Sequence, residues 1–515
     1  STQIGMNQLK RVLKSAQSDD NITALYLNFS GLQAGPATLK EMRQAFTNFK
    51  ENTEKPIYAY AEVYTQKSLY LASVADSIFI QPNGMIELSG LSANVAYYKN
   101  MFQKIGVKPE IIRGSNNKFK SAVEPFIEDS MSYSNRLQLE TLLGDLWQEY
   151  AGAIADGRGL KIDDIQVLAD DFAVQSPKKS VEAGLIDALW YPDEMDEHLR
   201  KLVGAETVKD IDFISHETYD LATKTINTSA RDKVAVIYAI GDIMGGSGDE
   251  NTIGSVTTAN AIRKARLNDR VKAIVLRVNS PGGSSLASDV IWREMKLAKE
   301  TKPVIVSMGD YAASGGYYIS APADTILAQT NTITGSIGIF MTLFTAEELI
   351  EDKIGIHYDV VKTGEFADIL SLNRSLKETE KMKLQNLVDE GYGQFLSLVA
   401  EGRSLDSGYV DSIGQGRVWS GQRAMELGLV DLEGGLDDAI AIAAEKAGLE
   451  DYKLMELPVL KTGLQKIMSE LQMAKAKEDI LKDEFGEFYE QWKQVKKVKS
   501  WNEPQARMEF ELNIN

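Results

Sequence analysis

An internal repeat of long period restricts the fold of this chain more than any other feature of its sequence. Short segments of the first half recur in the second half, each 244 to 249 residues further along the chain. The clearest pairs are Asn21–Phe29 with Arg270–Val278, Lys55–Ala59 with Lys302–Val306, Lys104–Val107 with Lys353–Ile356, and Gly184–Asp187 with Gly428–Asp431. A period of this length is that of a whole domain, so the pattern predicts a domain that has been duplicated.

Both copies alternate β-rich runs with helical patterns. Such alternation is typical of βαβ units, whose right-handed crossovers place helices over a largely parallel sheet. We therefore predict an α/β fold with a first copy over residues 1–204, a polar connection over 205–232, a second copy over 233–450 and a helical extension over 451–515. The counterpart of the strand predicted at 233–240 would fall before Ser1, so we expect this sequence to lack the first strand of the first copy.

The composition excludes several kinds of site. The sequence has no cysteine, which excludes thiol catalysis, thiolate metal sites and disulfides. Its formal net charge of −18 argues against nucleic acid as a partner. His198, His216 and His357 lack metal-ligand spacing, and no phosphate-binding loop is present, so we expect neither a metal nor a cofactor. No run approaches the ~20 apolar residues that cross a membrane.

One serine of the second copy has the surroundings of a nucleophile. Ser314 follows a buried strand predicted at 304–306 and precedes an apolar stretch that predicts a helix. The N–H of Gly315 would open this helix unpaired, with the positive end of the helix dipole behind it. A serine at such a turn can attack a carbonyl while the neighbouring amide stabilises the developing oxyanion. The same small residues are equally compatible with a plain tight turn under a helix.

A second glycine turn of the same copy is placed where it can assist that serine. The strand predicted at 271–279 ends in Ser280-Pro-Gly-Gly283, and glycine lets a backbone amide approach a ligand closely. The amides of Gly283 and Gly315 can therefore point into one cavity and form an oxyanion hole. Taken alone, a glycine pair is more often an ordinary loop.

The two copies have lost different parts of this machinery. In the first copy, Ser30–Gly35 and Val63–Leu69 replace the two glycine turns, so the serine and both amide donors are absent there. Conversely, Lys120 of the first copy corresponds to Ala367 of the second. Complementary losses predict one composite site, which takes its nucleophile from one copy and its base from the other.

Lys120 is the candidate general base. A lysine can act as a base only when it is neutral, and burial in an apolar cavity lowers its pKa by disfavouring the ammonium form. Lys118 is the nearest competitor, and the match of Phe119 with a phenylalanine of the second copy favours Lys120. The alternative interpretation is a solvated surface lysine, since most lysines in proteins are exposed to solvent. His357, in an alternating run that predicts a strand at 355–360, is the alternative base within the second copy.

Ser336 is the candidate partner of this lysine. It lies in Thr334-Gly-Ser-Ile-Gly338, one predicted strand after the candidate nucleophile, and its hydroxyl can form a hydrogen bond with the amine. A turn serine without any function is the plainer interpretation of the same residue.

These motifs together resemble a known family. The segments that carry the resemblance are Ala312–Tyr317, Asn279–Gly283, Thr334–Gly338 and Lys120–Phe126. They are similar to the long, duplicated form of signal peptide peptidase A, of peptidase family S49 in the ClpP/crotonase-like superfamily. The resemblance implies tandem ClpP/crotonase-like domains and a serine protease. It also implies that Ser314 is the nucleophile, Lys120 the base, Ser336 the residue that orients the lysine, and Gly283 with Gly315 the oxyanion donors.

The resemblance also implies where such a protein works. Members of the family are anchored in the bacterial inner membrane with the catalytic part facing the periplasm, assemble as homotetramers and degrade cleaved signal peptides. For this chain we therefore expect extended apolar peptides as substrates, four copies in the assembly, and attachment to the membrane through a segment upstream of Ser1. Two other functions stay open, namely a crotonase-like acyl-CoA enzyme, which would need no serine nucleophile, and a catalytically inactive scaffold.

Overall fold

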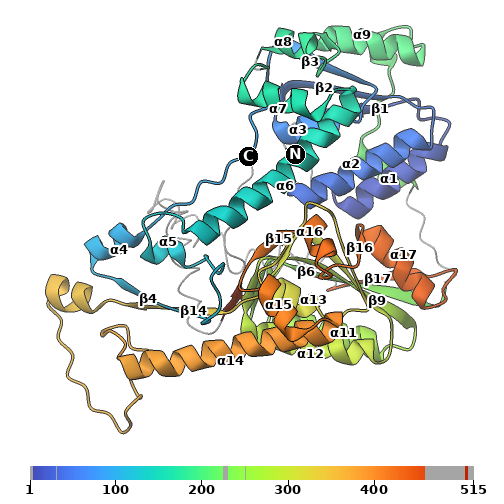
Figure 1. Ribbon diagram of the computed structural model, residues 1–515. Coiled ribbons are helices and arrows are strands. Elements are labelled where there is room, and N and C mark those ends of the chain that lie inside the picture. Colours follow the sequence, from blue (N-terminus) through green and yellow to red (C-terminus); the bar gives the residue numbers. More distant parts are fainter. Residues whose placement is uncertain are drawn as a thin grey trace.

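Two α/β units lie against each other in this protein, whose structure is a computed structural model (Figure 1). The structure describes residues 4–29, 32–174, 176–223, 230–249 and 251–458, and the backbone of 505–507. The first unit, blue to green in Figure 1, is formed by the first copy of the repeat, and the second unit, light green to red-orange, by the second copy. Both units alternate strands and helices, so the predicted α/β class is confirmed.

The central sheet of the second unit has its strands in the order β15-β13-β11-β9-β6-β17. Their bounds are β6 Lys233–Ile240, β9 Val271–Ser280, β11 Val304–Ala313, β13 Ile333–Gly335, β15 Val418–Ser420 and β17 Lys453–Leu457, and β12 Thr325–Ala328 and β16 Leu432–Glu433 branch from β11. All neighbours are parallel except β13 and β15. The strands β6, β9 and β11 are nearly continuous apolar runs, which is the pattern of strands covered on both faces.

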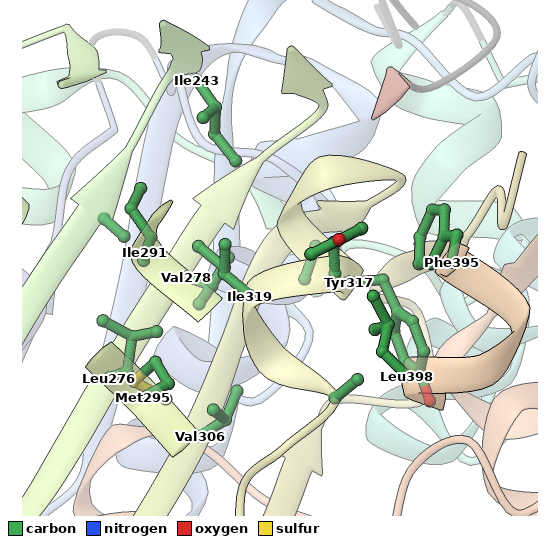
Figure 2. Packing of buried hydrophobic residues seen from close by; sticks show 14 of the residues in the cluster. Ile243, Leu276, Val278, Ile291, Met295, Val306, Tyr317, Ile319, Phe395 and Leu398 are labelled. Carbon is green, nitrogen blue, oxygen red and sulfur yellow. The ribbon is translucent and has the colours of Figure 1, made fainter. Parts of the chain in front are cut away.

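Helices cover both faces of this sheet. The helices of the second unit are α11 Ser255–Leu267, α12 Ser285–Lys299, α13 Gly315–Ser320, α14 Glu378–Arg403, α15 Ser407–Ile413, α16 Gly421–Glu426 and α17 Leu436–Lys446. Figure 2 shows Leu276 of β9 and Met295 of α12 in the cluster on one face, to which α11 also contributes. The adjacent residue Val275 packs under α17 on the other face. Because neighbouring residues of a strand point to opposite faces, the two clusters share the apolar residues of β9 between them.

The first unit repeats this architecture on a smaller, entirely parallel sheet, in the order β1-β2-β3-β5. Its elements are β1 Leu25–Leu27, β2 Ile57–Tyr64, β3 Ser77–Ile86, β5 Ala188–Leu189, α1 Met6–Ser18, α2 Pro36–Glu51, α3 Gln66–Ala72, α4 Lys99–Ile105, α5 Glu124–Ile127, α6 Tyr133–Arg158, α7 Ile162–Asp170, α8 Pro177–Glu182, α9 Pro192–Val203 and α10 His216–Thr223. Equivalent residues make equivalent contacts in the two units. Asp76 accepts a hydrogen bond from the N–H of Ile57, and Asp324 accepts one from the N–H of Val304, each at 2.8 Å.

A third sheet joins the two units, in the order β4-β14-β18-β10-β7-β8. Its strands are β4 Lys108–Arg113, β7 Asp242–Met244, β8 Thr252–Gly254, β10 Gly282–Ser284, β14 Phe340–Thr345 and β18 Gln505–Arg507. The strand β4 of the first unit pairs antiparallel with the whole of β14 from the second, with Arg113 opposite Phe340 and Lys108 opposite Thr345. This pairing holds the loop that follows β4, and with it Lys120, against the second unit.

Buried and half-buried ion pairs add to the contact between the units. The carboxylate of Glu41 in the first unit accepts a hydrogen bond of 2.5 Å from the guanidinium of Arg277 in the second, and both side chains are buried. Asp145 of the first unit forms a bidentate pair with Arg423, at 2.6 and 2.8 Å. Bidentate pairs restrict orientation as well as distance, so they help to fix one unit relative to the other.

The polar stretch between the copies contains a helix that the sequence pattern does not predict. This helix, α10, packs on α1 of the first unit, where Tyr219 is buried and Asp220 pairs with Arg11 at 3.1 Å. The connection therefore adds a helix to the first unit.

The range 451–515, for which we predict a helical extension, begins with a strand. The strand β17 pairs parallel with β6 and extends the central sheet at its edge. Residues 459–504 and 508–515, which include the stretches with helical spacing, lie outside the described residues. Within the part of the chain that the structure describes, no helix combines the length and the apolar character that crossing a membrane requires.

Candidate active site

Ser314 lies at the turn between β11 and α13, where the sequence predicts it, and its side chain is fully buried. Its φ of 54° and ψ of −113° fall in a region that residues with a side chain rarely adopt. Two backbone hydrogen bonds of 2.8 Å hold this conformation, because the N–H of Ser314 donates to the carbonyl of Gly335 and its carbonyl accepts from Tyr318. Backbone strain of this kind is concentrated at active sites.

The second glycine turn lies directly beside this serine. Ser280, at the end of β9, is the register partner of Ala312 near the end of β11. A Cβ at Gly316 would lie 2.7 Å from the carbonyl oxygen of Ser280, so only glycine allows the two turns to approach this closely. The strand β10 lies against α13 as a consequence.

The two glycines expected to donate to an oxyanion lie on these neighbouring elements. Gly283 is in β10, and Gly315 is the first residue of α13. A Cβ at Gly283 would lie 2.0 Å from the carbonyl oxygen of Ile243, so a side chain is sterically impossible there without displacing β7. The structure therefore brings both glycines close to Ser314: Gly283 follows the turn of Ser280, and Gly315 belongs to the turn that contacts it.

Lys120 reaches the same place from the other copy. Its Nζ lies 3.1 Å from the Oγ of Ser314, although the two residues belong to different units. The side chain is fully buried, so it is not the solvated surface lysine that is commonest for this residue type. The structure thus brings together the two residues that the complementary losses of the repeat assign to one composite site.

Ser336 completes this cluster. Its Oγ lies 2.6 Å and its carbonyl oxygen 3.1 Å from Nζ of Lys120. The residue is fully buried, has a φ of 50°, and donates its backbone N–H to the carbonyl of Arg417 at 2.7 Å. It is therefore held in a strained turn, as Ser314 is, with both of its oxygens directed at the amine.

These distances have a consequence for the protonation of the amine. An ammonium group donates three hydrogen bonds, which the Oγ of Ser314 and the two oxygens of Ser336 can accept. A neutral amine has only two N–H donors and one lone pair, and this lone pair can accept a hydrogen bond from a hydroxyl. A carbonyl oxygen cannot donate, and the hydroxyl of Ser314 lies within reach of the lone pair. The arrangement is therefore suited to removing the proton of Ser314 when the lysine is neutral.

Residues that the sequence motifs did not identify support the lysine. Gln138 on α6 donates to the carbonyl of Phe119 at 3.1 Å and to the hydroxyl of Ser121 at 2.6 Å, so it holds the residues on both sides of Lys120. A Cβ at Gly416 would lie 2.6 Å from the Cβ of Lys120, so glycine is required there as well. No local pattern around Gln138 distinguishes it from other polar residues of a long helix.

An arginine links the lysine loop to the turn of Ser336. The guanidinium of Arg417 lies 4.9 Å from the ring of Phe119 and 4.1 Å from the ring of Trp419, and burial lowers its pKa. Cation–π contacts of this kind attach the charged group to the aromatic faces. Because the carbonyl of the same residue accepts from Ser336, Arg417 contacts both sides of the cluster.

The competing candidates lie elsewhere. Lys118 is exposed, with its Nζ 5.4 Å from the ring of Phe119. His357 is exposed too, and the strand predicted at 355–360 is wrong, because these residues have no regular secondary structure. Within the described part of the chain, no group of three or more acidic or histidine side chains is arranged to hold a metal ion.

The helix that follows the nucleophile is anchored at its centre. The hydroxyl of Tyr317 donates to the carbonyl of Leu429 at 2.8 Å, and burial raises the pKa of this tyrosine, so it remains a neutral donor. Figure 2 shows Tyr317 in the core on the side of Phe395 of α14, and Ile319 beside Val278 of β9. The short helix is thereby packed on several sides, which limits movement of Ser314.

Known proteins match this chain over most of its length. The profile of peptidase family S49 matches residues 49–206 and 296–450, one segment in each copy, which confirms the duplication. Protease 4 of Salmonella typhi is 39% identical over 458 residues, which cover 86% of this chain and 72% of that protein. Protease 4 of Haemophilus influenzae is 38% identical over 83% of this chain and 71% of its own length. The chloroplastic serine protease SPPA of Arabidopsis thaliana is 35% identical over 90% of this chain and 70% of its own.

Proposed function

The chain belongs to peptidase family S49 and is a serine protease, and from this premise we propose that it hydrolyses peptide bonds with a dyad of Ser314 and Lys120. The observation that carries the proposal is the distance of 3.1 Å between Nζ of Lys120 and Oγ of Ser314. The family assignment decides against the acyl-CoA enzyme and the inactive scaffold that the sequence alone leaves open.

The proposed reaction begins with the neutral form of Lys120. Its lone pair takes the proton of Ser314 as the serine oxygen attacks the carbonyl carbon of the peptide bond. The resulting ammonium then returns the proton to the departing amine, which leaves an ester on Ser314. Water hydrolyses this ester with Lys120 acting as the base a second time. Complete burial of the lysine supports this role, because it disfavours the charged form between turnovers.

Two other groups have proposed roles in the same cycle. Ser336 orients Lys120, since its hydroxyl and carbonyl oxygens both accept hydrogen bonds from the amine that contacts Ser314. The amides of Gly283 and Gly315 stabilise the oxyanion that forms when the substrate carbonyl is attacked. The positions of the two glycines support this role, because both lie on elements that meet beside the nucleophile.

Labelling with a fluorophosphonate tests the nucleophile directly. This reagent phosphonylates serines that a neighbouring base has activated, so we expect one adduct, on the peptide that contains Ser314. Protein unfolded in denaturant before exposure to the reagent is the control and should remain unlabelled, since unfolding separates the two units. An adduct on a different serine, or none on folded protein that cleaves peptides, would contradict the proposal.

We further propose that the substrates are extended, largely apolar peptides, including cleaved signal peptides. The support is the similarity of the four motifs to signal peptide peptidase A and the identity shared with the protein named serine protease SPPA. The same similarity supports attachment to the bacterial inner membrane, with the catalytic part facing the periplasm.

A homotetramer is the proposed assembly, and an exposed apolar segment supports it. Residues 354–372, between β14 and α14, project from the body of the second unit (Figure 1) and expose several large apolar side chains. Among them, Val361 is 96% exposed and Ile356 is 48% exposed. Exposed apolar side chains gathered on one segment are typical of an interface between subunits.

Light scattering at micromolar concentration tests this assembly. We expect a mass four times the 56.9 kDa of one chain. The double variant Ile356→Asp, Val361→Asp should give a smaller species, because two charges would be buried in the interface. As a control, Leu221→Asp replaces a leucine of α10 that is 81% exposed and should keep the mass of the wild-type protein. A monomeric wild-type protein would refute the tetramer.

A further inference from the structure

The loop that carries Lys120 is attached to the second unit, although it belongs to the first copy of the repeat. Ser115 donates its N–H and its hydroxyl to the two carboxylate oxygens of Asp389 on α14, each at 2.7 Å. The side-chain amide of Asn116 donates to Oδ2 of Asp411 on α15 at 2.6 Å. Two carboxylates of the second unit therefore hold the start of this loop directly.

A buried tyrosine extends one of these contacts to the residue before the lysine. The hydroxyl of Tyr392 on α14 donates to Oδ1 of Asp411 at 2.6 Å and accepts from the N–H of Gln415 at 3.1 Å. The carbonyl of Gln415 in turn accepts from the N–H of Phe119 at 3.0 Å. Asp411 is thus connected to the loop at two places, once through Asn116 and once through Tyr392 and the turn that follows α15.

The turn after α15 also packs directly on the backbone of the lysine. Gln415 has a φ of 54°, which residues with a side chain rarely adopt, so its conformation depends on the contacts around it. A Cβ at the next residue, Gly416, would lie 2.6 Å from Cβ and 2.7 Å from Cα of Lys120. The hydroxyl of Tyr392 therefore holds, through the N–H of Gln415, a strained turn against which Lys120 lies.

We propose that Asp411 and Tyr392 are positioning residues, which hold the loop so that the amine of Lys120 stays within reach of Ser314. They act through the backbone of the loop, at the residues before the lysine. Precise placement matters because a displacement of about 1 Å between reacting groups can lower a rate about a hundredfold. The inference rests on the proposed function, since it presupposes that Lys120 is the base.

Exchanging the two side chains of one contact tests this role. Asn116→Asp removes a hydrogen bond and places a carboxylate opposite Asp411, so the loop should shift and kcat for a fluorogenic peptide should fall by about tenfold or more. KM should change little, because a general base acts in the chemical step. Adding Asp411→Asn restores an amide opposite a carboxylate, and the oxygen of the new amide can still accept from Tyr392. The double variant should regain kcat to within about threefold of the wild-type value, and a double variant as slow as Asn116→Asp would overturn the proposal.

Tyr392→Phe gives an independent measurement. It removes the hydroxyl and keeps the ring that packs in the core of the second unit, so kcat should fall by about tenfold with KM little changed. The matched control is Tyr219→Phe in the first unit, because Tyr219 is also 6% exposed and also donates to an aspartate, Asp19, at 2.8 Å. This control should lower the melting temperature by a similar amount and keep the wild-type kcat. A wild-type kcat in Tyr392→Phe would contradict the inference.

Combination with Lys120→Ala separates this inference from the catalytic proposal. If Tyr392 acts through Lys120, Tyr392→Phe should not lower the residual kcat of Lys120→Ala any further. A further tenfold loss in that background would show that Tyr392 acts elsewhere, and would overturn the inference while the dyad stands. Wild-type activity of Lys120→Ala would instead refute the dyad, and with it the role proposed for Asp411 and Tyr392.

Discussion

Ser314→Ala is expected to lower kcat/KM for an unstructured apolar peptide by at least about a thousandfold, because it removes the hydroxyl that forms the covalent intermediate in the proposed reaction. The fold should persist, since the backbone bonds of residue 314 to Gly335 and Tyr318 do not involve the hydroxyl, and Lys120 keeps both oxygens of Ser336. We expect circular dichroism and the melting temperature to remain close to those of the wild-type protein.

The matched control is Ser180→Ala in the first unit. Ser180 is also fully buried, and its hydroxyl donates to the carbonyl of Val174 at 2.8 Å, but it lies on α8 of the first unit, away from the catalytic cluster. Its loss should leave turnover unchanged even if the melting temperature falls. Wild-type turnover by Ser314→Ala would show that another residue is the nucleophile.

Lys120→Ala is expected to reduce kcat/KM by about a hundredfold to ten-thousandfold, the usual contribution of a general base. Lys120→Arg should be equally impaired, because a guanidinium keeps the charge and the donors but cannot become neutral. The arginine variant therefore distinguishes a base from a positive charge that only assists binding. Lys118→Ala and His357→Ala replace exposed residues and should retain wild-type activity.

The pH profile of kcat/KM gives a second test of Lys120 as the general base. A neutral lysine is the active form, so wild-type kcat/KM should rise as the pH rises and the ammonium loses its proton. A histidine base would instead reach its plateau soon after pH ~7. The residual activity of Lys120→Ala should lose this rise. If His357→Ala were inactive and Lys120→Ala active, the composite site would be wrong and the catalytic residues would all lie within 233–450.

The sequence predicts much of this site because the two copies of the repeat can be compared with each other. Each copy serves as a reference for the other, so the replacement of Lys120 by Ala367 shows which residues one copy has kept and the other has lost. The position of Ser314 between a strand and a helix follows from local pattern alone. Neither observation requires knowledge of how the two units are docked.

Features that depend on contacts between distant segments were not predictable. The pairing of β4 with β14, which places the lysine loop, joins strands more than two hundred residues apart. The alternation at 355–360 predicts a strand, yet a strand needs a neighbouring edge, and the N–H of Ile356 donates instead to the carbonyl of Ile350 in the preceding turn, at 2.9 Å. Gln138 was missed for the same reason, since its partners belong to a loop that only the folded chain brings near.

Under the proposed dyad, the ladder between β4 and β14 also limits the stage of synthesis and folding at which the chain can become active. Synthesis proceeds from the N-terminus, so the domain that carries Lys120 emerges and folds before Ser314 has been made. Under the proposed dyad, a partly made chain contains a base without a nucleophile and cannot hydrolyse other proteins. The proposed dyad requires both domains to have folded and docked along the ladder between β4 and β14 before hydrolysis can begin. Because of the duplication, only a completely synthesised chain can form the proposed site. Substitutions that weaken the docking should therefore abolish proteolysis while both domains remain folded.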